Sequence, residues 1–451
     1  MADFYPVSYA IQEKHREEMT KSDKAKMNDV VFIDGGRTPF LRAGTDFKNL
    51  SAYDLGRRAI VGLVNKTKLD GELIDRVYLG NVIQDINTSN VSRESSLAAG
   101  LPGTIPATTV SMACISSNMA LTMAKDTIET GNARAAIVGG TEVMSDIPIR
   151  FRKKFRQKLL ETQKYKSPGD YLKFFKNLKP SDLLPEIPSI SEFSTGETMG
   201  QSCDKMAAKY DVSREEQDAY ALRSHLKADQ AKEHLAGEIF PVSLKNGKHI
   251  VDEDNGIRGD STPAKMASLN PAFIKPHGTV TAGNSSFLTD GASAGLIMNR
   301  EFALENGYKP KAILRSYSYV AKRPGDELLI GPALAVPKVL DDMKLSLSDI
   351  DVFEFHEAFA GQMLTVLKAL ASDDFAKERL GRKKAVGKVP YDTLNSWGGS
   401  LSIGHPFGAT GVRLVTTAAN RLIDEGGKYA LIAACAAGGQ GHAMVVEKFE
   451  S

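Results

Sequence analysis

The chain has 451 residues, 42% of them hydrophobic and 25% charged, and its formal net charge is +2. This balance is typical of a globular protein with more than one hydrophobic core, and it excludes a disordered or fibrous chain. Three widely separated cysteines without a CxxC pair argue against a disulfide framework and a structural zinc site, and they favour a reducing compartment.

The N-terminal segment 1–28 is polar, and we expect it to be a loosely held extension. It carries several acidic residues and no apolar run, so it matches neither a secretory signal nor an acid-poor transit peptide. No stretch of the chain approaches the roughly 18 consecutive apolar residues of a membrane span. Together these features predict a cytoplasmic protein.

Packed structure is predicted to begin near Asp29, where "VVFIDGGRTPF" indicates a buried strand that ends in a Gly-Gly turn. Strand-like and helical segments then alternate to about residue 148, which is typical of an α/β layer architecture. We assign 29–148, together with 282–304, to a first α/β half. The alternation returns over 305–451, the second half, which ends in two apolar strands.

The two halves resemble each other. "LIDRVYLGNVI" (73–83) can be laid on "DIDVFEFHEAF" (349–359), because each places a short apolar strand ahead of a polar turn. We infer a duplicated α/β unit, and such duplications put a site at the seam between the halves.

Residues 149–281 lose the regular alternation, and we expect an inserted domain there. Its segment 150–180 contains eleven Lys or Arg residues and two acidic ones. Phe151, Phe155 and Leu159 recur every four residues, and a second apolar set follows a break at 167–169. This spacing predicts two short, basic, amphipathic helices.

Three functions compete for segment 150–180. Apolar faces beside Lys and Arg favour a pair of helices that lies on a membrane surface. A docking surface for a partner subunit is a second interpretation. In the third, the apolar faces pack on the inserted domain, and the basic face is solvated or helps to attract an anionic substrate. No nucleic-acid-binding motif accompanies the charge.

Cys114 precedes "ISSNMALTMAKDTIET", whose apolar residues have helical spacing. The thiol is therefore predicted at a helix N-terminus, where unpaired N–H groups and the macrodipole favour the thiolate and lower its pKa. Taken alone, a cysteine is more often a small buried hydrophobe. Cys203 has no glycine turn or polar cluster beside it, and we interpret it as structural.

Three further residues stand where strands or glycine turns end. His356 follows an apolar strand, His405 lies in the glycine-rich "GGSLSIGHPFGATG", and Cys435 ends the strand "YALIAA". The glycines allow close approach of the backbone to another segment or a ligand. A cysteine nucleophile with a histidine base indicates acyl transfer through a thioester. A second thiol suits proton transfer at a carbon next to a thioester carbonyl, or at a leaving thiolate.

Five ordered segments resemble the thiolase family, over nearly the whole chain. "SMACISSNMA" resembles the family's nucleophile segment and "TVTAGNSSFLTDGA" its CoA-contacting segment. "HEAFAG", "GGSLSIGHPFGATG" and "CAAGGQGHAMVVE" resemble its three C-terminal active-site segments. Within the family, "EFSTGETMG", "KPHGTVTAGNSSFLTDGAS" and "HEAF" look most like the β subunits of fatty-acid oxidation trifunctional complexes.

The resemblance implies an α/β, five-layer αβαβα fold of two similar halves with a loop domain inserted in the first. It implies that Cys114 attacks a 3-keto carbonyl, that His405 takes the thiol proton, and that Cys435 protonates the departing acetyl-CoA enolate and later deprotonates CoA. His356 would hold the enolate oxygen in one oxyanion hole. Backbone N–H groups of Cys114 and of a residue near Gly438 would form a second.

Two positions depart from many relatives, which have Asn where His356 stands and Gly where Ala437 stands. Histidine still offers a donor, whereas alanine in this turn constrains the backbone angles. For CoA, the resemblance places Ser286 at the pantetheine arm and Arg258 at the nucleotide end. It implies CoA as co-substrate, with no permanently bound cofactor and no metal.

The expected function is a 3-ketoacyl-CoA thiolase that cleaves medium- to long-chain substrates in fatty-acid β-oxidation. An acetoacetyl-CoA thiolase working in the synthetic direction is the alternative. A decarboxylating ketoacyl synthase would have two histidines and lack Cys435, and a decayed lipid-binding relative would have lost a catalytic position. The expected partners are a second copy of the chain, an α subunit with hydratase and dehydrogenase activities, and a membrane surface contacted through 150–180.

Overall fold

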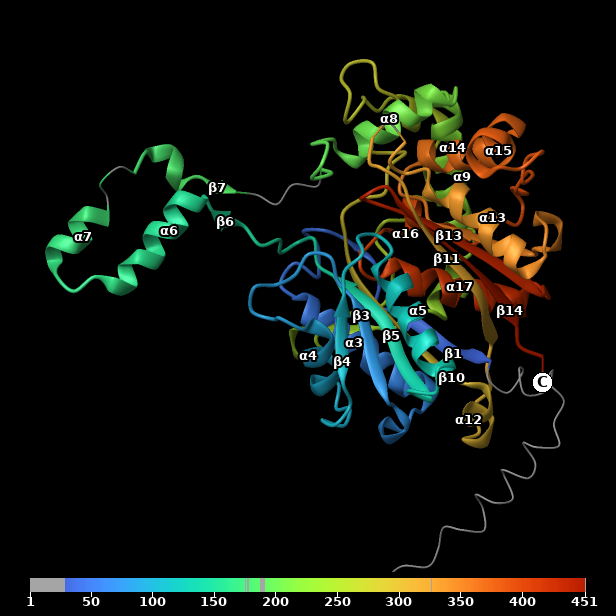
Figure 1. Ribbon diagram of the computed structural model, residues 1–451, viewed down its shortest axis with the longest axis horizontal. Helices are drawn as coiled ribbons and strands as arrows, with labels where there is room; N and C mark the ends of the chain where they lie inside the picture. Colours follow the sequence, from blue (N-terminus) through green and yellow to red (C-terminus); the bar gives the residue numbers. More distant parts are fainter. Residues whose placement is uncertain (1–28, 175, 177, 187–190, 326, 451) are drawn as a thin grey trace, which may run out of the picture.

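The computed structural model describes residues 29–174, 176, 178–186, 191–325 and 327–450, so the predicted extension 1–28 lies outside the described residues. Within that part of the chain, a ten-stranded mixed sheet runs through the molecule (Figure 1). Its strands follow in the order β12 (Val352–Phe355), β13 (Tyr429–Ala436), β14 (Gln440–Lys448), β11 (Ala312–Ala321), β1 (Val30–Arg37), β10 (Thr289–Asn299), β5 (Ala135–Glu142), β3 (Arg76–Gly80) and β4 (Ala107–Val110), and β2 (Leu41–Arg42) pairs with β10.

One pairing pattern repeats on either side of the contact between β1 and β11. In the first half, β1 pairs antiparallel with β10, β10 antiparallel with β5, and β5 parallel with β3. In the second half, β11 pairs antiparallel with β14, β14 antiparallel with β13, and β13 parallel with β12. The segments aligned in the sequence contain β3 and β12, which hold equivalent places. The predicted duplication is therefore confirmed.

The helices and the two halves of the sheet form five layers (Figure 1), with one hydrophobic cluster at each outer boundary and a third on both sides of the central helices. Helices α3 (Ala52–Thr67) and α4 (Val91–Ala98) cover the outer face of the first half of the sheet. Helices α5 (Ser116–Glu129) and α17 (Thr410–Asp424) lie between the halves and pack on both. Helices α13 (Gly331–Met343) and α14 (Ala360–Leu370) cover the outer face of the second half. The expected five-layer αβαβα fold is confirmed.

The part of the expected insert that follows Met199 contacts both halves. Helix α8 (Met199–Lys209) and helix α9 (Arg214–Gln230) pack on α14, and the fully buried Cys203 belongs to this apolar cluster. Strands β8 (Val242–Leu244) and β9 (His249–Val251) pack on the first half. Short helices complete the chain: α10 (Lys232–Ala236), α11 (Pro263–Ala267), α12 (Arg300–Glu305), α15 (Asp373–Leu380) and α16 (Ser400–Ile403).

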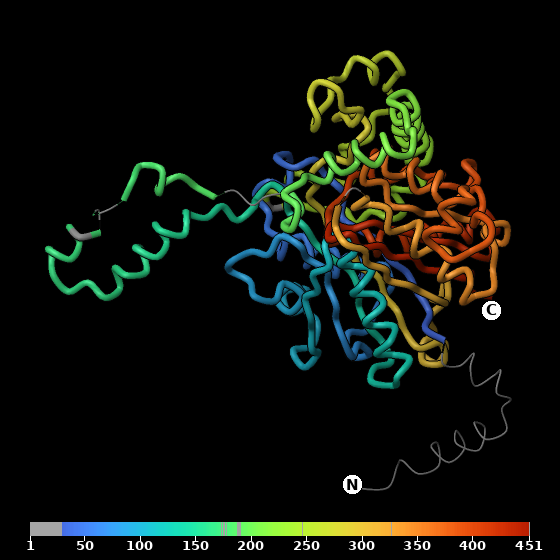
Figure 2. Tube along the Cα trace, turned by 45° about the horizontal axis from the view of Figure 1, so that its top comes forward, coloured from blue at the N-terminus to red at the C-terminus, as the bar shows by residue number. Residues whose placement is uncertain are grey.

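Residues 150–186, which we call the basic hairpin, project away from the body (Figures 1 and 2). Strands β6 (Arg150–Phe151) and β7 (Pro185–Glu186) pair at its base, and helices α6 (Lys153–Glu161) and α7 (Pro168–Phe174) form its arm. The two predicted helices are confirmed, although α7 begins inside the stretch expected to be the break. No helix among the described residues is both long and apolar enough to cross a membrane.

Three aromatic side chains of the basic hairpin contact one another. The ring centroids of Phe151 and Phe155 are 4.9 Å apart, and those of Phe155 and Phe174 are 5.7 Å apart. Leu160 and Leu172 remain 63% and 76% exposed. The third of the three interpretations, in which the apolar faces pack on the inserted domain, is therefore wrong for Leu160 and Leu172, which stay exposed on an arm that projects from the body.

A buried ion cluster holds α17 against the second half of the sheet. Arg421 on α17 donates to Glu354 on β12 at 2.7 Å, and Arg413, two turns earlier, lies 3.4 Å from the same carboxylate. All three side chains are inaccessible to solvent. Arg421 also donates to the carbonyl of Phe353 at 3.2 Å. Charges buried this deeply are tolerated only when paired, so the cluster fixes where α17 sits.

Replacing Glu354 with methionine is expected to destabilise the fold by roughly 3–5 kcal/mol, because two buried guanidinium groups lose the one carboxylate that they share. The matched control is Glu425→Met, which removes the other carboxylate bonded to Arg421, at 2.8 Å, but one that is 34% exposed. That change is expected to cost at most about 1 kcal/mol. Chemical denaturation followed by circular dichroism compares the two, and equal losses would contradict the prediction.

Candidate active site

Cys114 lies in the turn between β4 and α5, and the turn contains a strained residue. Ala113 has φ of 47°, in the left-handed region that alanine rarely adopts and that costs an L-residue about 1–2 kcal/mol. Ser116 holds this conformation, since its hydroxyl oxygen accepts from the N–H of Met112 at 2.8 Å and it donates to the carbonyl of Ala113 at 2.7 Å. Cys114 as a whole residue is partly exposed, but its thiol lies on the wall of a cavity and is enclosed by protein atoms.

His405 lies between α16 and α17, in a loop pressed against the first half of the sheet. Its N–H donates to the hydroxyl of Thr289 at 3.0 Å. A Cβ placed on Gly408 would lie 2.7 Å from the backbone oxygens of Gly80 and Thr141, closer than real contacts allow. The close backbone approach predicted from the glycines is confirmed at this position, and it brings His405 to the end of β10.

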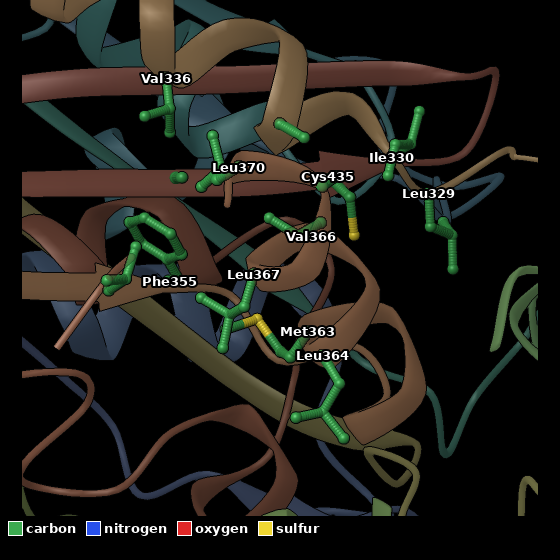
Figure 3. Packing of buried hydrophobic residues seen from close by; sticks show 14 of the residues in the cluster. Leu329, Ile330, Val336, Phe355, Met363, Leu364, Val366, Leu367, Leu370 and Cys435 are labelled. Carbon is green, nitrogen blue, oxygen red and sulfur yellow. The ribbon is translucent and has the colours of Figure 1, made fainter. Parts of the chain in front are cut away.

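His356 and Cys435 come from the ends of two adjacent parallel strands, β12 and β13. The N–H of His356 donates to the carbonyl of Ala433 at 2.8 Å, which continues the pairing of these strands. Cys435 lies one residue before the end of β13 and is buried. Figure 3 shows it among apolar side chains, near Leu329, Ile330 and Val366.

The fold brings these predicted residues together. The ring centroids of His356 and His405 are 4.0 Å apart. A ring nitrogen of each and the sulfur of Cys114 lie within 4.8 Å of one another, close enough to share a metal ion. A metal bound there would occupy the nucleophile, and we assign it no part in the chemistry.

A cavity of about 500 Å³ opens over the residues that carry the chemistry. Cys114, His405 and Cys435 contribute to its wall, and so does Ser286. The remaining wall is mainly apolar and includes Val82, Ile83, Met144, Ile147, Met199, Phe273, Phe287, Leu288, Leu329, Phe359 and Phe407. Such a cavity suits a long apolar ligand with one reactive polar end.

Arg258 does not line the cavity, but it belongs to a basic group beside it. Its side chain is exposed, and its N–H donates to Nδ1 of His225 at 3.2 Å. The guanidinium of Arg42 stacks 4.3 Å above the ring of Phe287, a wall residue. Burial, and then repulsion from Arg258, lowers the pKa of Arg42. An anionic ligand placed between the two arginines would relieve that repulsion.

Burial determines the protonation of the resting site. It raises the pKa of the Cys114 thiol to about 11, although the backbone N–H groups of Ala437 and Cys114 act in the opposite direction. The sequence-based expectation of a lowered pKa is therefore wrong. Desolvation of the thiolate outweighs the helix terminus. Burial, and then the charge of Arg413, lowers the pKa of His405 to about 3, so both groups are neutral at pH 7.

Cys435 and the turn after it complete the site. Burial, and then the nearby Cys114, raises the pKa of Cys435 well above its ordinary value, so this thiol holds its proton. The N–H of Gly438 is bonded to the Glu192 carboxylate at 2.7 Å, which leaves the N–H of Ala437 facing Cys114. Gly438 and Gly439 take the left-handed conformations of this turn, at φ of 84° and 71°, so Ala437 fits without strain.

Comparisons with known proteins agree with this geometry. Family models described as thiolase, N-terminal domain and thiolase, C-terminal domain match residues 30–301 and 308–448. The chain belongs to the thiolase family. It is 54% identical over 435 residues to the mitochondrial trifunctional enzyme subunit beta of Bos taurus, covering 95% of this chain and 91% of that protein. As a thiolase, it is an acyltransferase.

A second relative in sequence and a solved structure support the same family. A probable 3-ketoacyl-CoA thiolase of Caenorhabditis elegans is 54% identical over 428 residues, covering 94% of this chain and 95% of that protein. The solved structure of the Bacillus anthracis acetyl-CoA acetyltransferase superposes with a TM-score of 0.80 at 30% identity, covering 93% of this chain and 99% of that one. The thiolase fold is thus shown by sequence and by structure.

One residue of this thiolase site was missed in the sequence, although it directly follows His356. The buried carboxylate of Glu357 accepts from Tyr220 at 3.0 Å, Ser224 at 2.7 Å and Asn395 at 2.7 Å. These donors come from α9 and from the loop before α16, so Glu357 ties the insert to the loops of the site. A charged residue beside a buried strand end is the signal that could have revealed it.

The protonation of this site predicts how Cys114 reacts with iodoacetamide. Because only the thiolate reacts and its pKa is about 11, the alkylation rate is expected to rise about tenfold per pH unit from roughly pH 7 to pH 10. A thiolate favoured by the helix terminus would instead give a plateau near neutral pH. Mass spectrometry identifies the alkylated residue, Cys114→Ser abolishes the reaction, and the buried Cys203→Ala serves as the matched control.

Proposed function

We propose that this thiolase cleaves medium- to long-chain 3-ketoacyl-CoA with CoA, giving acetyl-CoA and a shortened acyl-CoA, as a step of fatty-acid β-oxidation. The observation that carries the proposal is the meeting of two thiols and the neutral imidazole of His405 on the wall of one mainly apolar cavity, with the neutral ring of His356 centred 4.0 Å from that of His405. Names of similar proteins, among them 3-ketoacyl-CoA thiolase and trifunctional enzyme subunit beta, support the same reaction.

In the first half-reaction, His405 takes the Cys114 proton as the sulfur attacks the 3-keto carbon of the substrate. The bond between C2 and C3 then breaks, which leaves an acyl group on Cys114 and the enolate of acetyl-CoA. Cys435 donates its proton to C2 of that enolate. The high pKa of Cys435 suits this step, because the thiol is protonated when the enolate forms.

In the second half-reaction, the Cys435 thiolate takes the proton of an incoming CoA thiol. The CoA sulfur attacks the acyl carbonyl, the bond to Cys114 breaks, and the Cys114 thiolate recovers its proton from His405. All four groups return to their starting states. No redox step is involved, so CoA as co-substrate is sufficient.

Two sets of donors stabilise the charges that form on oxygen. The backbone N–H groups of Cys114 and Ala437, which both face the nucleophile, are suited to the oxyanion at the carbon bonded to Cys114. His356 is suited to the enolate oxygen of the thioester. It is buried, and its Nε2 has no partner among the described residues.

The cavity supports the assignment of substrate. Its apolar wall extends well beyond what an acetyl group would contact, which favours longer acyl chains over the alternative, acetoacetyl-CoA synthesis. We assign Ser286, a residue of the cavity wall, to the pantetheine arm. We assign Arg258, together with Arg42, to the phosphates of the nucleotide end, because the two guanidinium groups repel each other in the absence of an anion.

The proposal is tested by thiolysis of 3-ketoacyl-CoA substrates from short to long chains. We expect the highest kcat/KM on medium and long chains, and activity confined to acetoacetyl-CoA would reject the chain-length assignment. Cys114→Ser is expected to lower kcat by at least about 1,000-fold, and Cys203→Ala to leave it unchanged. Substrate without CoA should leave an acyl group on Cys114, detected by mass spectrometry. Full activity of Cys114→Ser would reject the mechanism.

We further propose that the chain works with an α subunit of a β-oxidation complex and that the basic hairpin contacts a membrane. The printed name of a similar protein, trifunctional enzyme subunit beta, supports the first point. The exposed Leu160 and Leu172 beside many Lys and Arg residues support the second. Both fit a protein that receives its substrate from a neighbouring enzyme at a membrane.

Co-sedimentation with vesicles tests the membrane contact. Full-length protein is expected to bind vesicles that contain anionic lipid, and Leu160→Ser combined with Leu172→Ser is expected to reduce binding by about 10-fold or more, because two exposed apolar anchors are lost. Lys383→Glu with Lys384→Glu, two exposed residues outside the basic hairpin, is the control. Equal binding by all three proteins would reject the membrane proposal and leave the α subunit as the partner for this surface.

A further inference from the structure

Two neutral imidazoles share the site, and each can carry its single proton on either ring nitrogen. The functions proposed above, on which this inference rests, require the proton to be on different ring nitrogens in His356 and His405. His405 must offer a bare nitrogen to the Cys114 thiol, whereas His356 must present an N–H to an oxyanion. Neither Nε2 atom has a hydrogen-bond partner in the part of the chain that the structure describes, and only one of the four combinations of tautomers serves the reaction.

Ser400 restricts the choice at His356. Its hydroxyl lies 2.9 Å from Nδ1 of His356 and 3.2 Å from NH2 of Arg413. A guanidinium can only donate, so it occupies a lone pair of the Ser400 oxygen. Among the described residues the remaining partner for the hydroxyl proton is Nδ1 of His356. When Nδ1 accepts, the proton of a neutral imidazole must be on Nε2.

Thr410 restricts the choice at His405 in the opposite sense. Its hydroxyl lies 2.7 Å from Nδ1 of His405 and 3.0 Å from the backbone carbonyl of Pro406. A carbonyl can only accept, so it takes the hydroxyl proton, and the Thr410 oxygen is then left to accept from Nδ1–H. His405 therefore carries its proton on Nδ1, and its Nε2 is bare.

We propose that Ser400, oriented by Arg413, and Thr410 are positioning residues that hold the two histidines in opposite tautomers, making His356 the oxyanion donor and His405 the base. The guanidinium of Arg413 can only donate to Ser400, so the Ser400 hydroxyl donates to His356. The carbonyl of Pro406 can only accept from Thr410, so the Thr410 oxygen accepts from His405. The same functional group, a hydroxyl, thus gives two adjacent imidazoles different functions.

The surroundings keep both rings neutral, which this arrangement requires. Burial, the neighbouring His405 and the charge of Arg413 all lower the pKa of His356 well below its ordinary value. Arg413 is itself buried and paired with Glu354. A protonated His356 would carry N–H on both nitrogens and would lose the hydrogen bond from Ser400.

Nitrogen NMR of the resting enzyme tests the proposal without using its activity. In protein labelled with ¹⁵N-histidine, eight imidazoles are present, and His356→Gln and His405→Gln assign the two of interest. We expect His356 to show a protonated Nε2 and His405 a protonated Nδ1. The same tautomer at both histidines would overturn the proposal, whether or not the protein cleaves 3-ketoacyl-CoA.

Four variants separate a positioning role from a structural one. Ser400→Ala is expected to shift the tautomer of His356 alone, and Thr410→Val that of His405 alone, each with a loss of about 10- to 1,000-fold in kcat. Ser400→Thr and Thr410→Ser keep the hydroxyl and are expected to restore the wild-type spectrum. Unchanged spectra in the alanine and valine variants, both folded by circular dichroism, would overturn the proposal.

Ser402→Ala is the matched control for Ser400. Ser402 lies on the same short helix and is equally buried, but its hydroxyl bonds to Ser224 at 3.0 Å instead of to an imidazole. It is expected to leave both tautomers unchanged. A shift of His356 in this variant would show that the tautomer follows the packing of α16 and not the Ser400 hydroxyl, which would also overturn the proposal.

Discussion

The buried ion cluster of Arg413, Arg421 and Glu354 is the constraint on which the site depends. It joins the central helix α17 to strand β12 in a region without access to solvent. Because both arginines share the one buried carboxylate, α17 can neither rotate nor slide without breaking a buried ion pair to Glu354. The helix is therefore fixed along its axis, and its N-terminal end, where the loop of His405 arrives, is fixed with it.

Arg413 also connects the cluster to the chemistry. It donates to Ser400 on α16, and Ser400 contacts His356, which follows directly from the strand that carries Glu354. A single cation thus links β12, α16 and α17, the three elements that hold the two histidines. On the other side, Glu357 binds donors from α9 and from the loop before α16. The insert is in this way part of the frame of the site, even though its basic hairpin stands apart.

The sequence predicts much of this fold because the strands are continuous apolar runs and because the pattern occurs twice. Strand β5 is buried along its whole length, as expected for a strand covered on both faces. The four residues with unusual chemistry stand at strand ends and turns, where their positions follow from topology. Features that depend on distant contacts could not be predicted from the sequence. Alanine at position 113 does not indicate a left-handed backbone, and nothing in "GGSLS" indicates that Ser400 contacts Arg413.

The pKa of Cys114 likewise depends on distant contacts that the sequence does not reveal. A helix terminus stabilises a charge by at most about 2 kcal/mol, or roughly 1.5 pKa units, and the sequence reveals only that contribution. Burial of the thiol is a property of the assembled cavity, and it reverses the direction of the shift. A favourable local feature therefore predicts where a nucleophile lies better than it predicts its protonation state.

Cys114 and His405 are both neutral at rest, so the first proton transfer between them creates two charges. Transfer from Cys114 to His405 creates an imidazolium within the field of Arg413, which disfavours it. That proton is compensated first by the negative charge on the bound substrate and, once Cys435 has protonated the enolate, by the Cys435 thiolate, until Cys114 recovers the proton in the second half-reaction. The proposed tautomers meet this need, since the N–H of His356 faces the enolate oxygen while the bare nitrogen of His405 faces the thiol. The order of proton transfers is then set by where the substrate places its oxygens, and not by the resting pKa of any one residue.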